Sequence, residues 1–405
     1  MVGNHAFWSR RTLLGGAAGM LVAGAAGKLQ AAASGQPIRV GSTLALTGPL
    51  AQTAMIYKIV GEYYVEMLNN ANGMLGRPVE WVLYDDQSKP DVARSLYEKL
   101  LAVDKVDLIM GPYATGGILA AVGVAQRHNK LFIQSSLGMP HLVPYEMAFP
   151  ATPFGPEPNL TYPAKVLDMM ATAPNPPKTV TILTSKFPSA QYWSAGAKQV
   201  AEARGLKVPL YLEYEFGNRD FSAIAARVKE ANADFLWVGA LGLEGNQLLE
   251  AMKKLDYLPK RHFYLFPAPG PMAVAAEANN AFAQGNAEEH EPFTKNPVFA
   301  AFAKEFNIRA TKAGLPNPRI DGQAVVAYIA WELLTKAAEA TKSIDDKKMA
   351  AWLRSNTMDT IIWPMRFDGK FNHGEDQQTV RQLQDGKWVV VWPSQFSPPG
   401  VKPRF

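Results

Sequence analysis

The sequence has 405 residues, a net charge of only +5, 48% hydrophobic residues and no cysteine. The absence of cysteine excludes disulfides, thiol nucleophiles and thiolate metal sites. Its densest cationic stretches, Lys253-Lys254 and Lys347-Lys348, are isolated pairs, which argues against a nucleic-acid partner.

The first 33 residues have the pattern of a cleavable twin-arginine export signal. Ser9-Arg10-Arg11-Thr12-Leu13-Leu14 is followed by an Ala/Gly/Leu-rich stretch and by the small-residue run 31–33. Without these residues, which hold three cations and no acid, the net charge falls to +2. Every later apolar stretch is too short to span a bilayer. We therefore expect a protein of the periplasm that is not embedded in the membrane.

The next segment alternates apolar strands with helical patterns. Short apolar runs predict strands, and apolar residues at helical spacing predict the helices between them. The predicted strands are 38–44, 79–84, 106–110 and 131–133, and the predicted helices are 54–70, 90–103 and 115–128. This repetition is typical of a parallel sheet with helices on both faces.

The same alternation restarts after a proline-dense passage at 149–158. The predicted strands here are 179–183, 208–212, 235–238 and 262–266, with helices at 159–172, 191–204, 221–231 and 245–255. A second α/β lobe is expected, because a chain of this length exceeds the size of a single core.

A second proline passage at 267–271 precedes the last elements. Residues 297–313, 321–341 and 345–355 have helical patterns, whereas 363–367, 380–384 and 388–392 predict short antiparallel strands with Asp-Gly turns.

No constellation for catalysis, metal binding or cofactor binding is expected. The glycine-rich loop 111–117 lacks the Gly-Lys-Ser/Thr ending of a phosphate-binding loop, and no two of the six histidines have ligand spacing. The acidic pair Asp85-Asp86 ends a strand and is predicted to cap the helix that begins near Pro90.

Several motifs together resemble the branched-chain amino acid type of periplasmic substrate-binding protein, the receptor component of ABC importers. They are the stretches 69–80 and 84–90, Gly111-Pro112-Tyr113-Ala114-Thr115, 220–224 and 363–369. The resemblance implies two Rossmann-like α/β lobes with parallel central sheets, the type I periplasmic binding fold, joined by three crossings. Lobe 1 would comprise 37–151 plus 268–359 and lobe 2 would comprise 152–267 plus 360–405, with both proline passages at crossings.

In open α/β sheets, ligands bind beyond the carboxyl ends of the strands. Thr115 would open a helix there, so its hydroxyl and the first free amides suit a carboxylate. Ser135 and Ser136 follow the next strand. The resemblance implies that these positions grip a carboxylate, and that a further hydroxyl is missing at Gly138. A helix cap at Thr115 and a turn at the two serines are the structural alternatives.

Two aromatic side chains are expected to enclose the body of the ligand. By the resemblance, Tyr192 covers the ligand from lobe 2, with Tyr113 opposite it and Thr53 in the wall; simple packing is the alternative role. The predicted ligand-binding residues are Thr53, Tyr113, Ala114, Thr115, Ser135, Ser136, Tyr192 and Leu241.

The resemblance implies that, in relatives that bind amino acids, an acid and an aromatic hydroxyl of lobe 2 hold the ammonium group of the ligand. The corresponding positions fall near Leu241 and near Pro267 or Ala268, which carry no charge. An unpaired ammonium in a closed cleft would cost several kcal/mol, by order of magnitude. A small carboxylate with an aromatic body is therefore the favoured ligand. Glu244 would restore amino acid binding if it turned inward, but a solvated acid in the first helical turn is the favoured interpretation.

The sequence therefore predicts a monomeric periplasmic receptor, not an enzyme, that closes by a hinge around a small carboxylate and delivers it to an ABC permease. Within the same class, a branched-chain amino acid, a short amide or a urea-like compound is the alternative ligand. An exported hydrolase using Asp85 or Asp86 and a sensor subunit are the alternatives from other classes.

Overall fold

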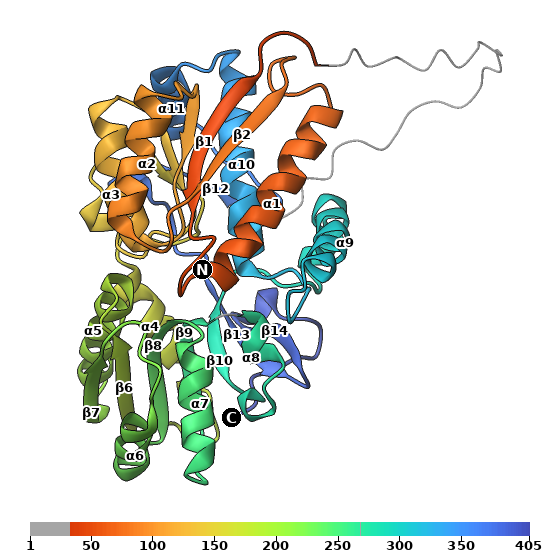
Figure 1. Cartoon of the computed structure of the whole chain (residues 1–405). Coiled ribbons are helices and arrows are strands. Elements are labelled where there is room, and N and C mark those ends of the chain that lie inside the picture. Colours follow the sequence, from red (N-terminus) through yellow and green to blue (C-terminus); the bar gives the residue numbers. More distant parts are fainter. Residues whose placement is uncertain (1–32, 268) are drawn as a thin grey trace, which may run out of the picture. The chain divides into compact units, whose positions relative to one another are not determined.

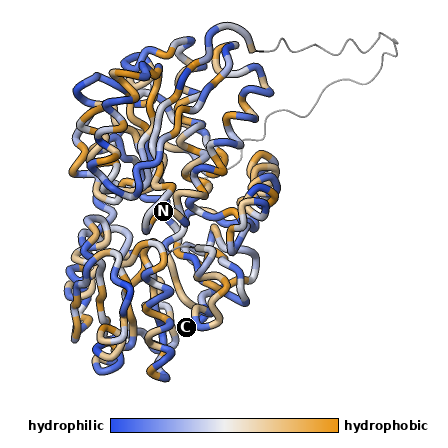
Figure 2. Tube along the Cα trace, viewed as in Figure 1, coloured by the Kyte–Doolittle hydropathy of each residue, from blue (hydrophilic) through white to orange (hydrophobic). Residues whose placement is uncertain are grey.

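The computed structural model describes residues 33–405 except 268, and the predicted signal peptide lies outside the described residues apart from Ala33. The described chain contains two large sheets, each with helices packed on it (Figure 1). Hydrophobic stretches occur in both lobes (Figure 2), as expected for sheets that are covered by helices. The α/β class with two lobes is confirmed.

The first sheet has the strand order β2-β1-β3-β4-β5 and is entirely parallel. Its strands are β1 (Ile38–Leu44), β2 (Val79–Asp85), β3 (Leu108–Met110), β4 (Phe132–Gln134) and β5 (Ala148–Pro150). Its helices are α1 (Ala51–Asn70), α2 (Pro90–Ala102), α3 (Thr115–Arg127), α9 (Pro297–Lys312), α10 (Gly322–Thr341) and α11 (Asp346–Ser355).

Apart from α9, which packs on α1, these helices form a layer on each face of the first sheet. Helices α2 and α3 pack on each other, and α10 packs between α1 and α11 (Figure 1). Helix α10 is buried along most of its length, as expected for a helix that is apolar all round. Its N-terminus is capped by Asp321, whose Oδ1 accepts hydrogen bonds from the amides of Gln323 and Ala324.

The second sheet has the order β14-β13-β10-β9-β8-β6-β7. Its strands are β6 (Thr179–Ser185), β7 (Lys207–Tyr214), β8 (Phe235–Gly242), β9 (His262–Pro267), β10 (Phe282–Gly285), β13 (Thr379–Gln384) and β14 (Lys387–Trp392). Helices α4 (Pro158–Ala171) and α5 (Pro188–Ala203) pack together, as do α6 (Ser222–Ala231) and α7 (Glu244–Lys254), and α8 (Pro269–Ala273) follows β9.

Three expectations about the chain's path are corrected. Strand β10 was not predicted, and it pairs with β9 and β13, so residues 282–285 belong with the second sheet rather than with lobe 1. The prolines at 267–271 therefore lead into α8, and the chain leaves the second sheet only after β10. The predicted strand 363–367 is reduced to β12 (Pro364–Met365), which pairs with β11 (Met358–Asp359) instead of joining the tail strands.

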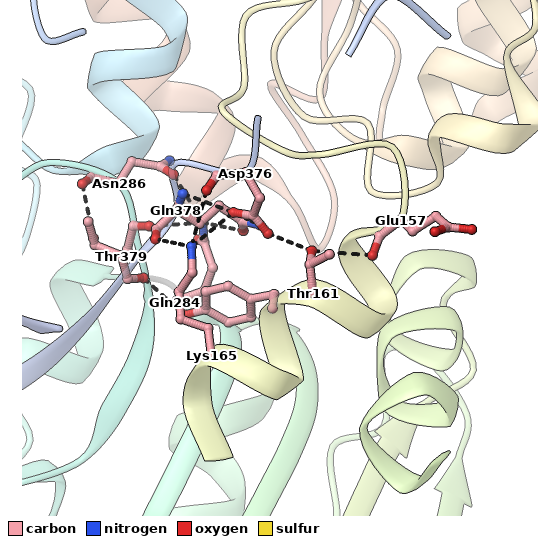
Figure 3. Close-up of polar contacts among 10 residues, drawn as sticks. Glu157, Thr161, Lys165, Gln284, Asn286, Asp376, Gln378 and Thr379 are labelled. Atoms are coloured by element: carbon pink, nitrogen blue, oxygen red, sulfur yellow. Dashed lines mark hydrogen bonds and ion pairs between the residues drawn. The ribbon is translucent and has the colours of Figure 1, made fainter. Parts of the chain in front are cut away.

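The chain passes from the first sheet to the second after β5, leaves the second sheet after β10 and returns to it at β13. The last passage is held against α4 (Figure 3). Lys165 Nζ lies 3.1 Å from Asp376 Oδ1 and donates to the carbonyl of Gln378 at 2.7 Å. Thr161 Oγ1 donates to the other carboxylate oxygen of Asp376 at 2.6 Å.

The second and third passages are also bonded to each other. Thr379 Oγ1 donates to the carbonyl of Asn286 at 2.9 Å, and Gln284 Nε2 donates to Gln378 Oε1 at 3.3 Å (Figure 3). Two crossing segments far apart in sequence are therefore linked to each other, and the last of them is linked to α4.

Candidate functional site

Residues from the carboxyl ends of strands in both sheets line one cavity, and its empty space of about 410 Å³ includes its opening to solvent. The lining residues are Tyr113, Ala114, Thr115, Ser135, Ser136, Thr152, Phe154, Ser189, Leu241, Phe266, Gln284, Asn286, Gln323 and Val326. Six of the eight predicted ligand-binding residues are among them. No lining residue carries a charge, although hydrogen-bonding groups are abundant.

The N-terminus of α3 supplies free amides to this cavity. The N-cap residue Ala114 is extended and offers no side-chain acceptor, so the amides of the first turn have no partner within the helix. They carry the positive end of the helix dipole. An uncharged cavity with this helix end in its wall suits an anionic group.

The Thr115 hydroxyl positions a loop. It accepts a hydrogen bond from the amide of Gly138 at 3.0 Å and donates to the carbonyl of Ser136 at 3.2 Å. Its only proton is therefore used inside the protein, and the carboxylate contact that we predicted for this hydroxyl would require that bond to break. The amide of Ser136 is likewise occupied, because it donates to Gln134 Oε1 at 3.1 Å.

Two hydroxyls in the lining have no hydrogen-bond partner. Ser136 Oγ and Thr152 Oγ1 are both buried and unpaired. They lie at adjacent strand ends, because β4 and β5 pair Gln134 with Pro150, two residues before each of them. A buried unpaired hydroxyl costs about 1–3 kcal/mol, so these two groups are unsatisfied polar atoms in the cavity wall.

The second sheet contributes an apolar and aromatic wall. Leu241 lies near the carboxyl end of β8, and Phe266 lies near the carboxyl end of β9. Phe154 lies in the crossing after β5. Behind them, the fully buried Trp193 makes edge contacts with Phe154 and Phe266 at ring distances of 5.3 and 5.2 Å. These rings offer an apolar ligand body a rigid surface.

Helix α5 of the second lobe meets the loop that follows β4. Trp193 Nε1 donates to the carbonyl of Gly138 at 2.6 Å. A Cβ added at Gly138 would lie 2.6 Å from Ser189 Cβ, closer than real carbon contacts. Ser189 therefore fills the space in which the resemblance implied a further hydroxyl at position 138, and glycine is required there by this close approach.

Carboxamides complete the lining. Gln284 Nε2 donates to Asn286 Oδ1 at 3.2 Å, and Gln323 Oε1 accepts from the Tyr57 hydroxyl at 2.7 Å. Gln284 lies in β10 and Asn286 directly follows it, so both were missed because β10 was not predicted. Gln323 follows the N-cap of α10, and no sequence signal had placed that helix end at the cavity.

Of the two predicted aromatic residues, Tyr113 lines the cavity and Tyr192 does not. Tyr113 lines the cavity; burial raises its pKa to about 12, while a hydrogen bond with Thr53 opposes this rise. Thr53 is buried but is outside the lining. Tyr192 is also outside it and packs on His141, with ring centroids 4.7 Å apart. Tyr113 therefore contacts the cavity from one side without Tyr192 opposite it.

Glu244 is buried rather than solvated, so the favoured interpretation of this acid was wrong. Its carboxylate accepts hydrogen bonds from the amides of Leu241 and Gly217 and from the hydroxyl of Ser185, at 3.0 to 3.2 Å. Burial raises its pKa above the usual value, and these hydrogen bonds oppose the rise. Glu244 does not line the cavity, and its oxygens are used by its own lobe.

The side chains of Asp85 and Asp86 bond to threonines near the end of β1 and do not cap α2. The N-cap residue of α2 is Lys89, and no side chain caps this helix. Asp85 accepts from Thr47 Oγ1 at 2.8 Å, and Asp86 accepts from Thr43 Oγ1 at 2.7 Å. Burial raises the pKa of Asp86 to about 6.

Among the residues that the structure describes, no group of three or more His, Cys, Asp or Glu side chains could hold a metal ion.

Comparison with known proteins places the chain in a family. The profile of the periplasmic binding protein family matches residues 37–387. The chain belongs to the periplasmic binding protein family. Within the described part of the chain, no helix has the length and apolar character needed to cross a membrane.

One relative of this periplasmic binding protein is the leucine-, isoleucine-, valine-, threonine- and alanine-binding protein of Pseudomonas aeruginosa. It is 27% identical over 337 residues, which cover 82% of this chain and 86% of the relative. The chain is a solute-binding receptor of ABC transporters.

Two solved structures show the same fold with different ligands. A solute-binding protein from R. palustris in complex with benzoate has a TM-score of 0.74 at 19% identity and covers 88% of this chain and 95% of its own. A branched-chain amino acid transporter substrate-binding protein from Streptococcus pneumoniae, in complex with isoleucine, has a TM-score of 0.71 at 19% identity, with coverages of 88% and 99%. Both confirm the type I fold.

Proposed function

We propose that the protein is a periplasmic receptor that binds a small carboxylate with an aromatic body and delivers it to an ABC permease. The observation that carries the proposal is the lining of the cavity, which holds a helix N-terminus and unpaired hydroxyls but no charged side chain. The carboxylate would lie at the N-terminus of α3 near Ser136. The ring would pack on Phe154, Leu241 and Phe266.

We also propose how the protein is exported and how it closes around its ligand. The Arg10-Arg11 pair supports export through the twin-arginine route, and periplasmic binding proteins close around ligands by hinge motion. We infer that the two lobes close as a monomer, with boundaries near those predicted except that residues 282–285 move with lobe 2.

An amino acid is the second candidate ligand, since the curated relatives carry branched-chain amino acid names. Such a ligand would bring an ammonium group into the cavity. Glu244, the acid that the sequence offered as its partner, already accepts hydrogen bonds from backbone amides. Burying an unpaired cation costs several kcal/mol, by order of magnitude. The cavity therefore favours an acid without an amine.

A thermal-shift comparison of benzoate with leucine tests the ligand class. A ligand that binds only the folded state stabilises it by about 2.7 kcal/mol at a concentration 100 times its Kd. We expect benzoate to raise the melting temperature and leucine to leave it unchanged. A rise with leucine alone would overturn the aromatic acid in favour of the amino acid. Turnover of the ligand by the purified protein would overturn the receptor role.

Replacing Ser136 with alanine is expected to weaken benzoate binding about tenfold, because one hydrogen bond to a charged group is lost. Calorimetric titration measures the change. The control is Ser95→Ala, whose hydroxyl lies exposed on α2 and donates to the carbonyl of Asp91. Equal Kd values for Ser136→Ala and the wild type would remove Ser136 from the carboxylate site.

A further inference from the structure

The second residue of α10, Gln323, lines the cavity in which the ligand is proposed to bind (the ligand cavity), and its side chain is half buried. Its backbone amide donates to the N-cap residue Asp321, and this bond does not depend on the side chain. Asp321 is outside the lining of the ligand cavity, and its Oδ2 lies 3.9 Å from Arg381 Nη1. Gln323 is therefore the polar side chain through which α10 reaches the ligand cavity.

A buried tyrosine fixes the orientation of the Gln323 carboxamide. The hydroxyl of Tyr57, in α1, donates to Gln323 Oε1 at 2.7 Å. Burial raises the pKa of Tyr57 well above its usual value, so the hydroxyl keeps the proton that it donates. Tyr57 is outside the lining of the ligand cavity, so this bond holds the carboxamide oxygen toward the protein behind the wall.

The nitrogen of the same carboxamide is available to a ligand. Gln323 Nε2 carries two N–H groups, and it has no hydrogen-bond partner among the residues that the structure describes. It is not one of the fully covered unpaired atoms either, unlike Ser136 Oγ in the same wall. The nitrogen therefore keeps accessible surface, and the residue that carries it lines the ligand cavity.

The groups proposed to hold the carboxylate lie around the same tyrosine. The Tyr57 hydroxyl oxygen is 3.4 Å from the carbonyl of Ser135, the residue before Ser136. The Tyr57 ring packs on Tyr113 with centroids 5.0 Å apart, and Tyr113 immediately precedes the N-cap residue of α3. The Gln323 carboxamide, which is bonded to Tyr57, therefore lies close to both the loop after β4 and the start of α3.

Hydrogen-bond donors of this kind distinguish an acid from an amide. The free backbone amides of α3 and the Nε2 group of Gln323 can only donate. A carboxylate offers only acceptors, so both of its oxygens match such groups. A carboxamide of the same shape would place an NH2 group against donors and leave it unpaired, which carries an uncompensated desolvation cost.

Resting on the proposed function, we propose that Gln323 is a ligand-binding residue whose Nε2 donates to the carboxylate of the ligand, and that Tyr57 is a positioning residue that holds Gln323 in this orientation. Together they select an acid over an amide of the same shape. Gln323 supplies the side-chain donor that Thr115 does not, because the proton of the Thr115 hydroxyl is used within the protein.

Calorimetric titration of two Gln323 variants with benzoate and benzamide tests the contact. We expect Gln323→Leu to weaken benzoate binding about tenfold, because a hydrogen bond to a charged group is lost. Gln323→Glu should weaken it at least about 100-fold, because two carboxylates then face each other, and should bind benzamide more tightly than the wild type does. Gln323→Glu keeps the size of the side chain and decides the question if Gln323→Leu does not fold. An unchanged Kd for benzoate in either variant would remove Gln323 from the site.

A double-mutant cycle tests the positioning role of Tyr57. In Tyr57→Phe the ligand itself has to order the Gln323 side chain, so benzoate should bind about fivefold more weakly. In the Gln323→Leu background, the same substitution should change the Kd by less than about twofold, because no carboxamide remains to be positioned. The same loss in both backgrounds would overturn the positioning role.

The matched control is Tyr145→Phe. Tyr145 is also buried in the first lobe, and its hydroxyl donates to the carbonyl of Lys130 at 2.8 Å. It is outside the lining of the ligand cavity, so its replacement should leave the Kd for benzoate unchanged.

Leucine separates a failure of this inference from a failure of the proposed function, since it carries a carboxylate without an aromatic ring. If the wild type binds leucine and not benzoate, the aromatic acid is overturned, while a roughly tenfold loss of leucine affinity in Gln323→Leu still supports the contact. If the wild type binds benzoate and Gln323→Leu binds it equally well, the inference fails and the proposed function stands. Binding of neither acid would overturn both.

Discussion

Replacing Arg381 with methionine is expected to lower the free energy of unfolding by about 3–5 kcal/mol at pH 8. The guanidinium is 4% exposed and lies 2.8 Å from Glu288 Oε1 and 3.9 Å from Asp321 Oδ2. Methionine keeps much of the apolar stem that packs in β13 but removes the ion-pair partner that lies between two buried carboxylates. Urea denaturation monitored by circular dichroism measures the change.

The loss should be smaller at pH 5 than at pH 8. Burial raises the pKa of Glu288 to about 7, Arg381 opposes this rise, and Asp321 adds to it. A carboxyl with a raised folded-state pKa takes up a proton on folding, so its contribution to stability falls as the pH rises from about 4.5 toward 7. Without Arg381 this pKa rises further, and the penalty above neutral pH grows.

Two variants separate the buried charge from other effects of the substitution. Arg381→Met with Glu288→Gln removes one of the two stranded carboxylates and is expected to recover part of the stability. Arg127→Met breaks an exposed pair with Glu98 and should change stability little. A loss for Arg381→Met that is the same at pH 5 and pH 8 would contradict the electrostatic explanation.

Gly138→Ala is expected to weaken ligand binding roughly 10 to 100-fold. The new Cβ would lie 2.6 Å from Ser189 Cβ, so the N-terminus of α5 would have to move away from the loop after β4. Overpacking of this kind costs about 1–3 kcal/mol. The movement would also disturb the 2.6 Å hydrogen bond from Trp193 to the carbonyl of Gly138. Calorimetric titration with benzoate measures the affinity.

A rescue variant distinguishes the collision from a general effect of alanine. Gly138→Ala combined with Ser189→Gly removes the second carbon and should return the affinity to that of Ser189→Gly alone. Gly123→Ala within α3 is the control, since its nearest atom is the end of the flexible Arg127 side chain at 3.8 Å. An affinity of Gly138→Ala equal to that of the wild type would show that the loop and α5 separate without cost.

Most elements of both lobes were predictable because buried parallel strands read as continuous apolar runs and the helices between them keep their periodicity. Strand β10 was missed because Phe282-Ala283-Gln284-Gly285 is short and contains a glycine and a polar residue. Its pairing with β9 and β13 comes from the fold, and no local pattern predicts it. That one omission also hid Gln284 and Asn286 from the predicted site.

The first-lobe part of the site was predictable from topology, since Thr115, Ser135 and Ser136 follow strands whose ends meet at one sheet edge. Which of two adjacent helical residues faces the cavity was not predictable. Tyr192 and Trp193 are adjacent on α5, about 100° apart around its axis, and packing turns Trp193 toward the cavity wall. The inward direction of the Glu244 side chain was not predictable either, because it results from hydrogen bonds with the amides of Leu241 and Gly217.

The neutral lining of the ligand cavity bears on how a cargo leaves. If the proposed ligand is held by helix amides, hydroxyls and aromatic rings, opening of the lobes would separate it from dipoles, and no ion pair would have to be broken. Unloading at the permease would then be governed by the work of opening the lobes and rewetting the rings. Contacts of this kind act over a short range, so they would weaken after a small displacement of the ligand.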